Sequence, residues 1–277
     1  MTSGAFDGEK GNGRLFIMPK ILITGRGGSG KSTLVTLLAR VLGDRGKVLV
    51  VDTDESNLGL CKMLGQEPPA LTLMGCLGGK SAVKEKLLSS NNETKKVFVD
   101  NLTITSLPDE CLGGQWPIRY LRIGKIERSL EGCACPMGAV ARAFLKELRV
   151  GQDEWVLVDT EAGVEHFGRG VPQGVDLVVI VVDPSQEALL LAARTQKLCT
   201  DLNKKFMVVL NKADTTASAY LHQELAARGM VVAGILPFIK EIWQANMLGE
   251  SLAVDMCGIE AEGLATMVAD FSGHRRN

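Results

Sequence analysis

Short apolar runs alternate along the chain with longer segments of helical periodicity. The runs rich in Val, Ile and Leu lie at residues 21–23, 48–51, 97–105, 155–158, 177–182, 206–210 and 231–236. Continuous apolar runs are typical of strands that are buried on both faces, as in a parallel sheet. A helix is predicted over 32–42, and further helical segments separate the later runs. The pattern therefore predicts an α/β fold with a doubly wound, mostly parallel sheet, which binds ligands at the carboxyl ends of its strands.

A glycine-rich loop joins the first apolar run to its helix. It consists of Gly25, Arg26, Gly27, Gly28, Ser29, Gly30, Lys31, Ser32 and Thr33. In such a loop, backbone N–H groups and the start of the next helix surround a phosphate group. We expect Lys31 to reach the β- and γ-phosphates as a catalytic residue, and the Ser32 hydroxyl to bind magnesium. The loop predicts a magnesium-dependent nucleotide hydrolase of the P-loop class.

Two acidic segments follow strands and are expected near the loop. Asp54 lies just after the run 48–51, and Asp159 just after the run 155–158. We expect Asp159 to hold the water molecules of the magnesium ion, and Asp54 to orient the attacking water. The backbone N–H of Gly163 is expected to approach the γ-phosphate.

The length and the net charge of the chain limit the number of domains and the kinds of partner that we expect. The 277 residues carry a net charge of −1, which gives no electrostatic reason to expect nucleic acid or an anionic membrane surface as partner. We expect a disordered extension at 1–17, one domain at 18–277, a cytoplasmic location and no stable membrane association. Residues 106–135 give the weakest sequence pattern in the chain, and we interpret them as an insertion with a special function.

The chain has seven cysteines, and we expect no export signal, so the sequence predicts free or metal-bound thiols rather than disulfides. Five of them lie in apolar or helical surroundings and are interpreted as small core residues. These are Cys61, Cys76, Cys111, Cys199 and Cys257.

The loop resembles the deviant phosphate loop of the MinD/ParA/nitrogenase-iron-protein ATPases. In that family a lysine follows the first glycine and reaches the phosphates of the partner subunit, and here Arg26 stands in its place. Arginine keeps the charge and offers a bidentate fork to phosphate. The resemblance implies a P-loop fold of the MinD-like type, a catalytic role for Arg26, and a homodimer that forms around ATP.

A narrower resemblance is to the CooC-type nickel-insertion ATPases of carbon monoxide dehydrogenase. It rests on three segments, which are residues 52–58, the pair Cys133 and Cys135, and residues 159–170. Two thiolates cannot complete a four-coordinate nickel or zinc site, but a twofold axis would supply two more. The resemblance implies that ATP-driven dimerisation builds this site and that nickel is delivered to a carbon monoxide dehydrogenase-type apoenzyme. His166, in the third segment, is expected to make a structural hydrogen bond.

Other interpretations remain open. In the resembled family Asn211 would contact adenine, with Lys212 and Pro237 nearby, yet Asn211, Lys212 and Asp214 also fit the N-K-x-D pattern of guanine sites. We favour ATP. A positioning or partitioning ATPase that binds membrane or DNA is the main alternative function, through an apolar stripe over 259–271 that more often packs on the parent sheet. An iron–sulfur carrier is the third, although its cysteines would come singly rather than as a pair.

Overall fold

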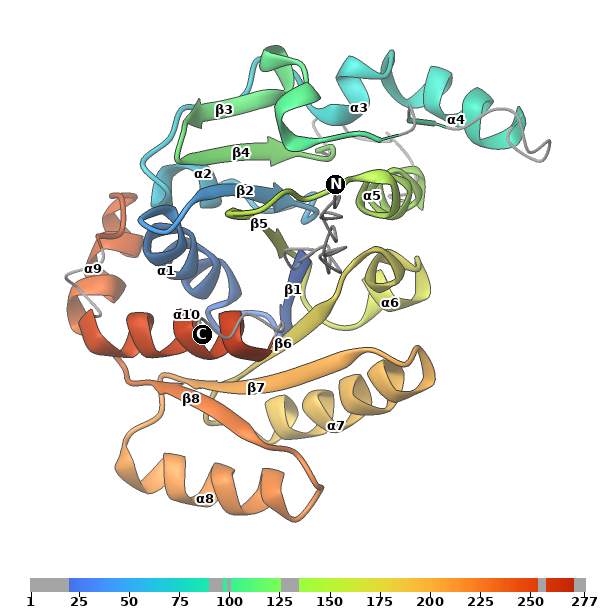
Figure 1. Ribbon diagram of the computed structural model, residues 1–277. Helices are drawn as coiled ribbons and strands as arrows, with labels where there is room; N and C mark the ends of the chain where they lie inside the picture. Colours follow the sequence, from blue (N-terminus) through green and yellow to red (C-terminus); the bar gives the residue numbers. More distant parts are fainter. Residues whose placement is uncertain (1–19, 90–96, 99–100, 126–134, 254–257, 272–277) are drawn as a thin grey trace, which may run out of the picture.

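The computed structural model describes residues 20–89, 97–98, 101–125, 135–253 and 258–271. In this part of the chain, eight strands form one sheet in the order β3-β4-β2-β5-β1-β6-β7-β8 (Figure 1). Neighbouring strands pair in parallel except β3 and β4, which are antiparallel. The strands are β1 (Lys20–Gly25), β2 (Lys47–Asp52), β3 (Leu112–Gln115), β4 (Ile118–Arg122), β5 (Glu154–Asp159), β6 (Leu177–Val182), β7 (Lys205–Asn211) and β8 (Val232–Leu236).

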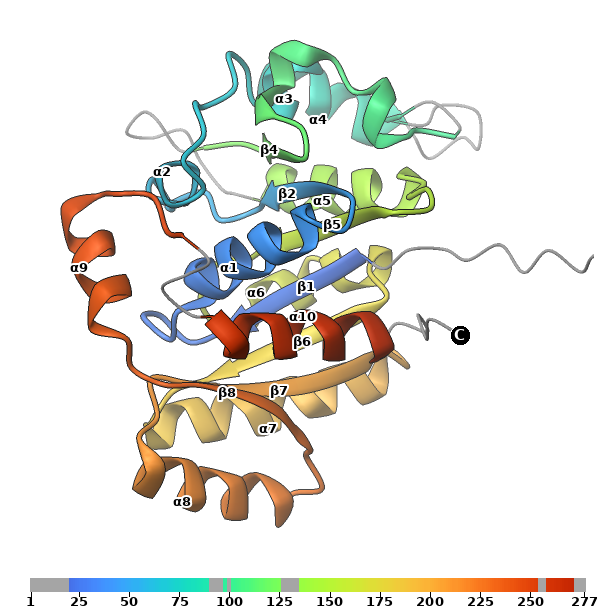
Figure 2. The same cartoon turned by 60° about the vertical axis from the view of Figure 1, so that its left-hand side comes forward.

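Helices cover both faces of the sheet, as its continuous apolar strands require. On one face α1 (Lys31–Gly43) lies beside α10 (Gly258–Phe271), and on the other lie α5 (Cys135–Glu147) and α7 (Gln186–Asp201) (Figures 1 and 2). The remaining α-helices are α2 (Leu60–Met63), α3 (Leu73–Cys76), α4 (Gly79–Ser89), α6 (Glu165–Gly168), α8 (Thr215–Ala226) and α9 (Lys240–Leu248). The prediction of a doubly wound, mostly parallel α/β fold is confirmed.

Strand register brings the glycine-rich loop and the acidic segments to one edge of the sheet. Asp52 at the end of β2 is paired with Asp159 at the end of β5, and Ile23 of β1 is also paired with Asp159. The loop that follows Gly25 therefore starts beside both carboxylates. This edge is where the sequence places the nucleotide.

One predicted strand is wrong. Among the described residues of 97–105 there is no strand, and Ile104–Ser106 forms a short 3-10 helix instead. Its start is closed by a capping box in which Thr103 and Ser106 satisfy each other's backbone N–H groups. The sheet takes its outer strands from 112–122, inside the segment interpreted as an insertion, because Ile118, Tyr120 and Leu121 supply the buried side chains.

The expectation of free thiols is wrong for one pair of cysteines. Cys76 and Cys111 form a disulfide across 35 residues of chain. Their segments lie side by side, since the Leu71 N–H donates to the Glu110 carbonyl at 2.9 Å, and this neighbourhood is not visible in the sequence spacing. Cys61 and Cys199 are buried free thiols, as predicted for core residues. Cys257 and the expected extension at 1–17 lie outside the described residues.

The C-terminal helix packs against the domain. Leu264 and Val268 of α10 are buried, and the helix contacts α1 and β8. The described side chains of the apolar stripe, Leu264 and Val268, therefore pack against their own domain, as expected. Within the described ranges, none of the helices combines the length and the apolar character that crossing a bilayer requires.

Candidate nucleotide-binding site

The loop between β1 and α1 requires glycine at two of its positions. A Cβ on Gly25 would lie 2.5 Å from the Val181 carbonyl oxygen, and one on Gly30 would lie 2.1 Å from Asn211 Nδ2. Gly30 also has a φ of +94°, which favours glycine. The loop therefore bends back closely over β6 and β7, with its N–H groups at the start of α1. This is the geometry of a phosphate cradle.

Lys31 points into this loop. Its side chain is largely buried, and Nζ donates to the carbonyl oxygens of Gly25 at 3.2 Å and Arg26 at 3.1 Å. Burial lowers the pKa of the ammonium group, and the carboxylates of Asp159 and Asp54 oppose this shift. The lysine is thus held where a phosphate in the loop would meet its charge.

Ser32 and Asp159 meet at the carboxyl edge of the sheet. Ser32 Oγ donates to Asp159 Oδ2 at 2.7 Å, and Asp159 is fully buried. Burial, reinforced by the neighbouring Asp52 carboxylate, raises the pKa of Asp159 to about 7. The other oxygen, Oδ1, is buried without a hydrogen-bond partner in the described structure. A hydroxyl and a carboxylate with a spare oxygen fit a hydrated magnesium ion, which takes oxygen ligands and keeps several waters.

Asn57 completes this cluster, and sequence reasoning missed it. Its Nδ2 lies 3.0 Å from Ser32 Oγ and 3.0 Å from Asp159 Oδ2. Asn57 belongs to residues 53–58, which we call the Asp54 loop. The only signal in the sequence was its place in the segment 52–58 that carried the resemblance.

A buried ion pair that was not predicted from the sequence contacts the Asp54 loop. Lys125 Nζ lies 2.8 Å from Asp52 Oδ2, and both side chains are almost fully buried. The same Nζ donates to the Asn57 carbonyl at 2.6 Å and to the Asp54 carbonyl. Tyr120 donates its hydroxyl to Asp52 Oδ2 at 2.5 Å. Burial raises the pKa of Asp52, and Lys125 and Tyr120 oppose the shift.

Two further predicted site residues lie at this edge. The Asp54 carboxylate accepts hydrogen bonds from the N–H and the hydroxyl of Ser56, at 2.9 and 2.7 Å. The Gly163 N–H donates to the Gly25 carbonyl at 3.2 Å, so this residue touches the phosphate loop directly. Gly163 has a φ of +89°, and a Cβ there would lie 2.4 Å from Glu165 Oε2.

The side chain of Arg26 contacts Asp183 of its own chain. Nε lies 2.8 Å from Asp183 Oδ1 and Nη2 lies 2.5 Å from Asp183 Oδ2. Asp183 follows β6 directly and is almost fully buried, whereas the arginine side chain is 29% exposed. The described contacts of the guanidinium are therefore made within the chain.

The two acidic segments are also linked to each other. Arg169 Nη1 lies 2.7 Å from Glu161 Oε1 and 3.6 Å from Glu55 Oε1. Burial and the Glu55 charge raise the pKa of Glu161, and Arg169 opposes this. The guanidinium thus bridges the Asp54 loop to the segment after β5.

The expected hydrogen bond of His166 is not found. Both ring nitrogens are buried without a hydrogen-bond partner among the described residues, and burial lowers the pKa of the imidazole to about 3. The side chain packs beside Phe167, with ring centroids 4.9 Å apart. Nothing in the sequence indicated that the ring of His166 would be buried beside Phe167.

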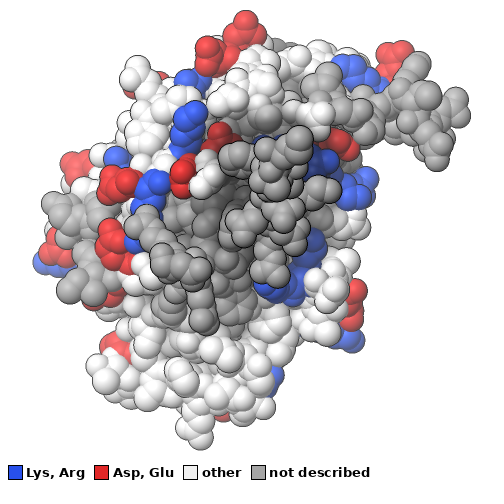
Figure 3. All heavy atoms as spheres, in the orientation of Figure 1, with Lys and Arg blue, Asp and Glu red and all other residues white. Residues whose placement is uncertain are grey.

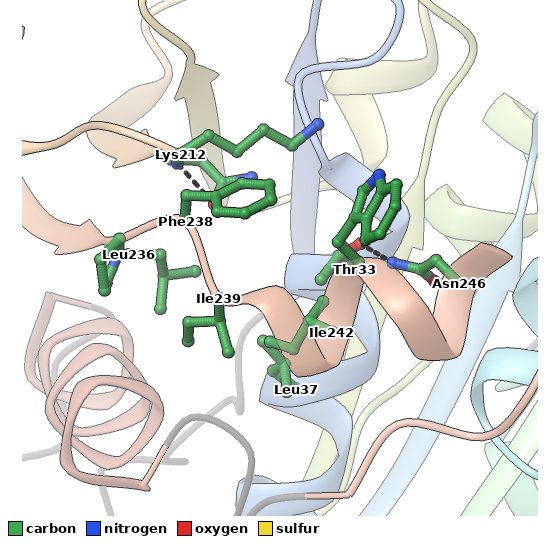
Figure 4. Close-up of a pocket in the computed structure, with 11 residues that line it drawn as sticks. Thr33, Leu37, Lys212, Leu236, Phe238, Ile239, Ile242 and Asn246 are labelled. Atoms are coloured by element: carbon green, nitrogen blue, oxygen red, sulfur yellow. Dashed lines mark hydrogen bonds between the residues drawn. The ribbon is translucent and has the colours of Figure 1, made fainter.

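A pocket beside the phosphate loop has the position expected for a nucleobase. Its lining includes Thr33 and Leu37 of α1 together with Phe238, Ile239 and Ile242 from the chain after β8 (Figure 4). The other lining residues are Asn211, Lys212, Leu236, Pro237, Trp243 and Asn246.

Two of these residues tie the pocket to the loop. Asn211 Nδ2 donates to the Ser29 carbonyl and Lys212 Nζ to the Gly28 carbonyl, each at 2.7 Å. Asp214 is not in the lining, because its carboxylate caps α8 by accepting from the Ala217 N–H at 2.8 Å.

The side chains of the predicted thiol site lie outside the described residues. Cys133 is not among the described residues, and of Cys135 only the backbone is described, as the first residue of α5. In the described part of the chain, His, Cys, Asp and Glu side chains form no group of three or more that could hold a metal ion. On the face drawn in Figure 3, basic side chains are interspersed with acidic ones.

Comparison with known proteins supports the nucleotide site. An uncharacterized ATP-binding protein of Methanocaldococcus jannaschii is 40% identical over 243 residues, which cover 87% of this chain and 96% of that protein. The carbon monoxide dehydrogenase accessory protein CooC of Rhodospirillum rubrum is 32% identical over 234 residues, covering 84% and 88%.

Solved structures show the same fold. The septum site-determining protein MinD of Pyrococcus horikoshii, complexed with Mg-ADP, superposes with a TM-score of 0.65 at 15% identity and covers 92% of this chain and 96% of that one. Residues 20–252 match the family described as the CobQ/CobB/MinD/ParA nucleotide binding domain. The chain therefore belongs to the CobQ/CobB/MinD/ParA family of nucleotide-binding domains.

Proposed function

We propose that the protein is a slow, magnesium-dependent ATPase. The observation that carries this is the cluster of Lys31, Ser32 and Asp159 at one edge of the sheet, with a spare buried carboxylate oxygen. Bound magnesium would neutralise phosphate charge. Ser32 would bind it, Asp159 would hold its waters, Lys31 would contact the β- and γ-phosphates, and Asp54 would orient the attacking water.

ATP is the preferred nucleotide. A guanine site of the N-K-x-D kind needs a free aspartate carboxylate to accept the two donors on the base edge. Asp214 instead caps α8 outside the pocket lining. The pocket walls of Phe238, Ile239 and Ile242 offer an apolar surface to a purine ring.

We further propose that this ATPase matures a metalloenzyme. The support is the 32% identity to a carbon monoxide dehydrogenase accessory protein, together with the pair Cys133 and Cys135. ATP would hold two subunits together, with Arg26 of each reaching the phosphates bound by the other. Four thiolates at the twofold axis would then bind nickel or zinc. Hydrolysis would release the complex after nickel has been passed to a carbon monoxide dehydrogenase-type apoenzyme.

A positioning or partitioning role is the second candidate, favoured by the structural likeness to MinD. Such proteins would sediment with liposomes or DNA in the presence of ATP. Clean supernatants for both would remove this candidate. A brown colour on purification would instead indicate an iron–sulfur protein.

The thiol pair gives the direct test of the maturation role. The Cys133→Ala/Cys135→Ala double variant should lose nickel and zinc binding and keep measurable ATP turnover. The matched control, Cys61→Ala/Cys199→Ala, changes two buried free thiols and should keep the metal. Metal content is measured by mass spectrometry after dialysis. An unchanged metal-to-protein ratio in the first variant would refute the thiol site.

A further inference from the structure

The side chain of Asn57 has a fixed orientation. Its Oδ1 accepts from the N–H of Gly59 at 2.9 Å and from that of Leu60 at 3.3 Å, at the start of α2. Because these two donors require an oxygen, the amide NH2 group must face the other way. It faces Ser32 Oγ and Asp159 Oδ2, at 3.0 Å from each.

The proposed magnesium site uses both residues, with Ser32 Oγ as a ligand of the ion and the Asp159 carboxylate as the acceptor for its water molecules. The Asn57 amide directs N–H donors at lone pairs of the same two side chains. The Asn57 oxygen cannot replace the amide as a ligand without giving up the N–H groups of α2. The amide and a divalent cation therefore compete for Ser32 and Asp159.

The Asp54 loop, which contains Asn57, also contacts Asp159 and Lys125. Thr53 Oγ1 donates to the Asp159 carbonyl at 2.7 Å. Lys125 Nζ donates to the carbonyls of Asp54 and Asn57. A displacement of Asn57 would strain these Lys125 contacts, because the lysine is also fixed to buried Asp52.

We propose that Asn57 is a positioning residue that occupies the cation site in the metal-free protein and is displaced when the cation binds. Displacement moves the Asp54 loop and alters its contacts with Lys125. This inference rests on the proposed magnesium–nucleotide site. It adds a residue that opposes cation binding at that site.

The test is the affinity of the full-length protein for Mn²⁺ in the presence of ADP, measured from the loss of the free Mn²⁺ signal in electron paramagnetic resonance. Asn57→Ser keeps a hydroxyl that can accept from the N–H groups of α2, but it is too short to reach Ser32 and Asp159. Loss of the competing hydrogen bonds should tighten Mn²⁺ binding by about threefold to tenfold. Ser56→Ala changes a residue of the same loop whose hydroxyl donates to Asp54, and it should bind Mn²⁺ as the wild type does.

Equal or weaker binding by Asn57→Ser would overturn the proposal, since it would mean that Asn57 does not compete or that it supports the cation through a water molecule. Asn57→Ala, which removes the whole amide, should give the same sign, and circular dichroism checks that both variants are folded. If the wild type binds neither ADP nor Mn²⁺, the proposed nucleotide site fails as well. That result is distinct from one in which only the order of affinities is wrong.

Discussion

The Arg26 guanidinium rests on the Asp183 carboxylate through two parallel contacts, of 2.8 Å from Nε and 2.5 Å from Nη2. A bidentate, charge-assisted pair of this kind is among the stronger side-chain contacts in proteins. The proposed dimer needs the same guanidinium to reach the phosphates of the partner subunit. Asp183 therefore competes with the partner's nucleotide for Arg26.

Removing this competitor should favour the dimer. Asp183→Asn keeps the shape of the side chain but weakens its hold on Arg26, so the dimer should form with a non-hydrolysable ATP analogue at about tenfold lower protein concentration. Sedimentation velocity over a concentration series gives the dissociation constant. Glu187→Gln is the control, because Glu187 is exposed and lies 3.9 Å from Arg26. A weaker dimer for Asp183→Asn would show that the pair serves dimerisation instead of opposing it.

Removing one partner of the buried Lys125–Asp52 ion pair should destabilise the protein. Lys125→Met leaves the Asp52 carboxylate buried without its cation and should lower the free energy of unfolding by about 3–5 kcal/mol. Adding Asp52→Asn should recover much of that loss, because no uncompensated charge remains. Urea unfolding measures both, with exposed Lys62→Met expected within about 0.5 kcal/mol of wild type. Additive losses in the double variant would argue against a coupled pair.

His166 should make the protein sensitive to acid. Its folded-state pKa of about 3 lies below the usual 6.5, so the unfolded chain binds more protons between these values. The contribution of neutral His166 to the free energy of unfolding is therefore complete above pH 6.5. It falls as the pH drops toward 3, by up to about 1.4 kcal/mol per pH unit.

The variant His166→Leu isolates this effect. It removes two buried nitrogens that have no hydrogen-bond partner among the described residues, and it should be at least as stable as wild type at pH 7. Its advantage should grow as the pH falls below 6.5, and urea unfolding at several pH values measures it. The control His222→Leu, at an exposed position, should run parallel to wild type. A variant that is less stable at pH 7, with unchanged acid sensitivity, contradicts this assignment.

Asp214 separates the two nucleobase interpretations. As the cap of α8, its replacement in Asp214→Ala should cost about 1 kcal/mol of stability and leave ADP affinity unchanged. Asn211→Ala should weaken ADP binding, because Asn211 lines the pocket and holds the Ser29 carbonyl. Calorimetric titration with ADP and GDP measures both. Preferential loss of GDP binding in Asp214→Ala would point to guanine.

The sequence predicted the parts of the site that local patterns determine. The glycine-rich loop and the strand ends at Asp52 and Asp159 follow from composition and apolar runs over a few residues. The fold class followed from the same runs, and the resemblance to MinD/ParA ATPases is confirmed at the level of the family.

What the sequence did not reveal depends on contacts between distant residues. Lys125 pairs with Asp52 across 73 residues, and Asn57 reaches Asp159 across 102. The strand β4, which lies next to the edge strand β3, was missed because Arg119 and Arg122 interrupt its buried residues, unlike the continuous apolar runs elsewhere. The Cys76–Cys111 disulfide likewise joins segments that only the folded chain brings together.

In the proposed mechanism, ATP joins two copies of the chain and so assembles a thiolate metal site. The most direct measurement is bound nickel or zinc per protomer, with and without a non-hydrolysable ATP analogue, on fractions of known oligomeric state. We predict a nucleotide-dependent dimer that binds one metal ion per two protomers, with little metal on the monomer. A protein that stays monomeric in every nucleotide state and binds no transition metal would contradict the claim.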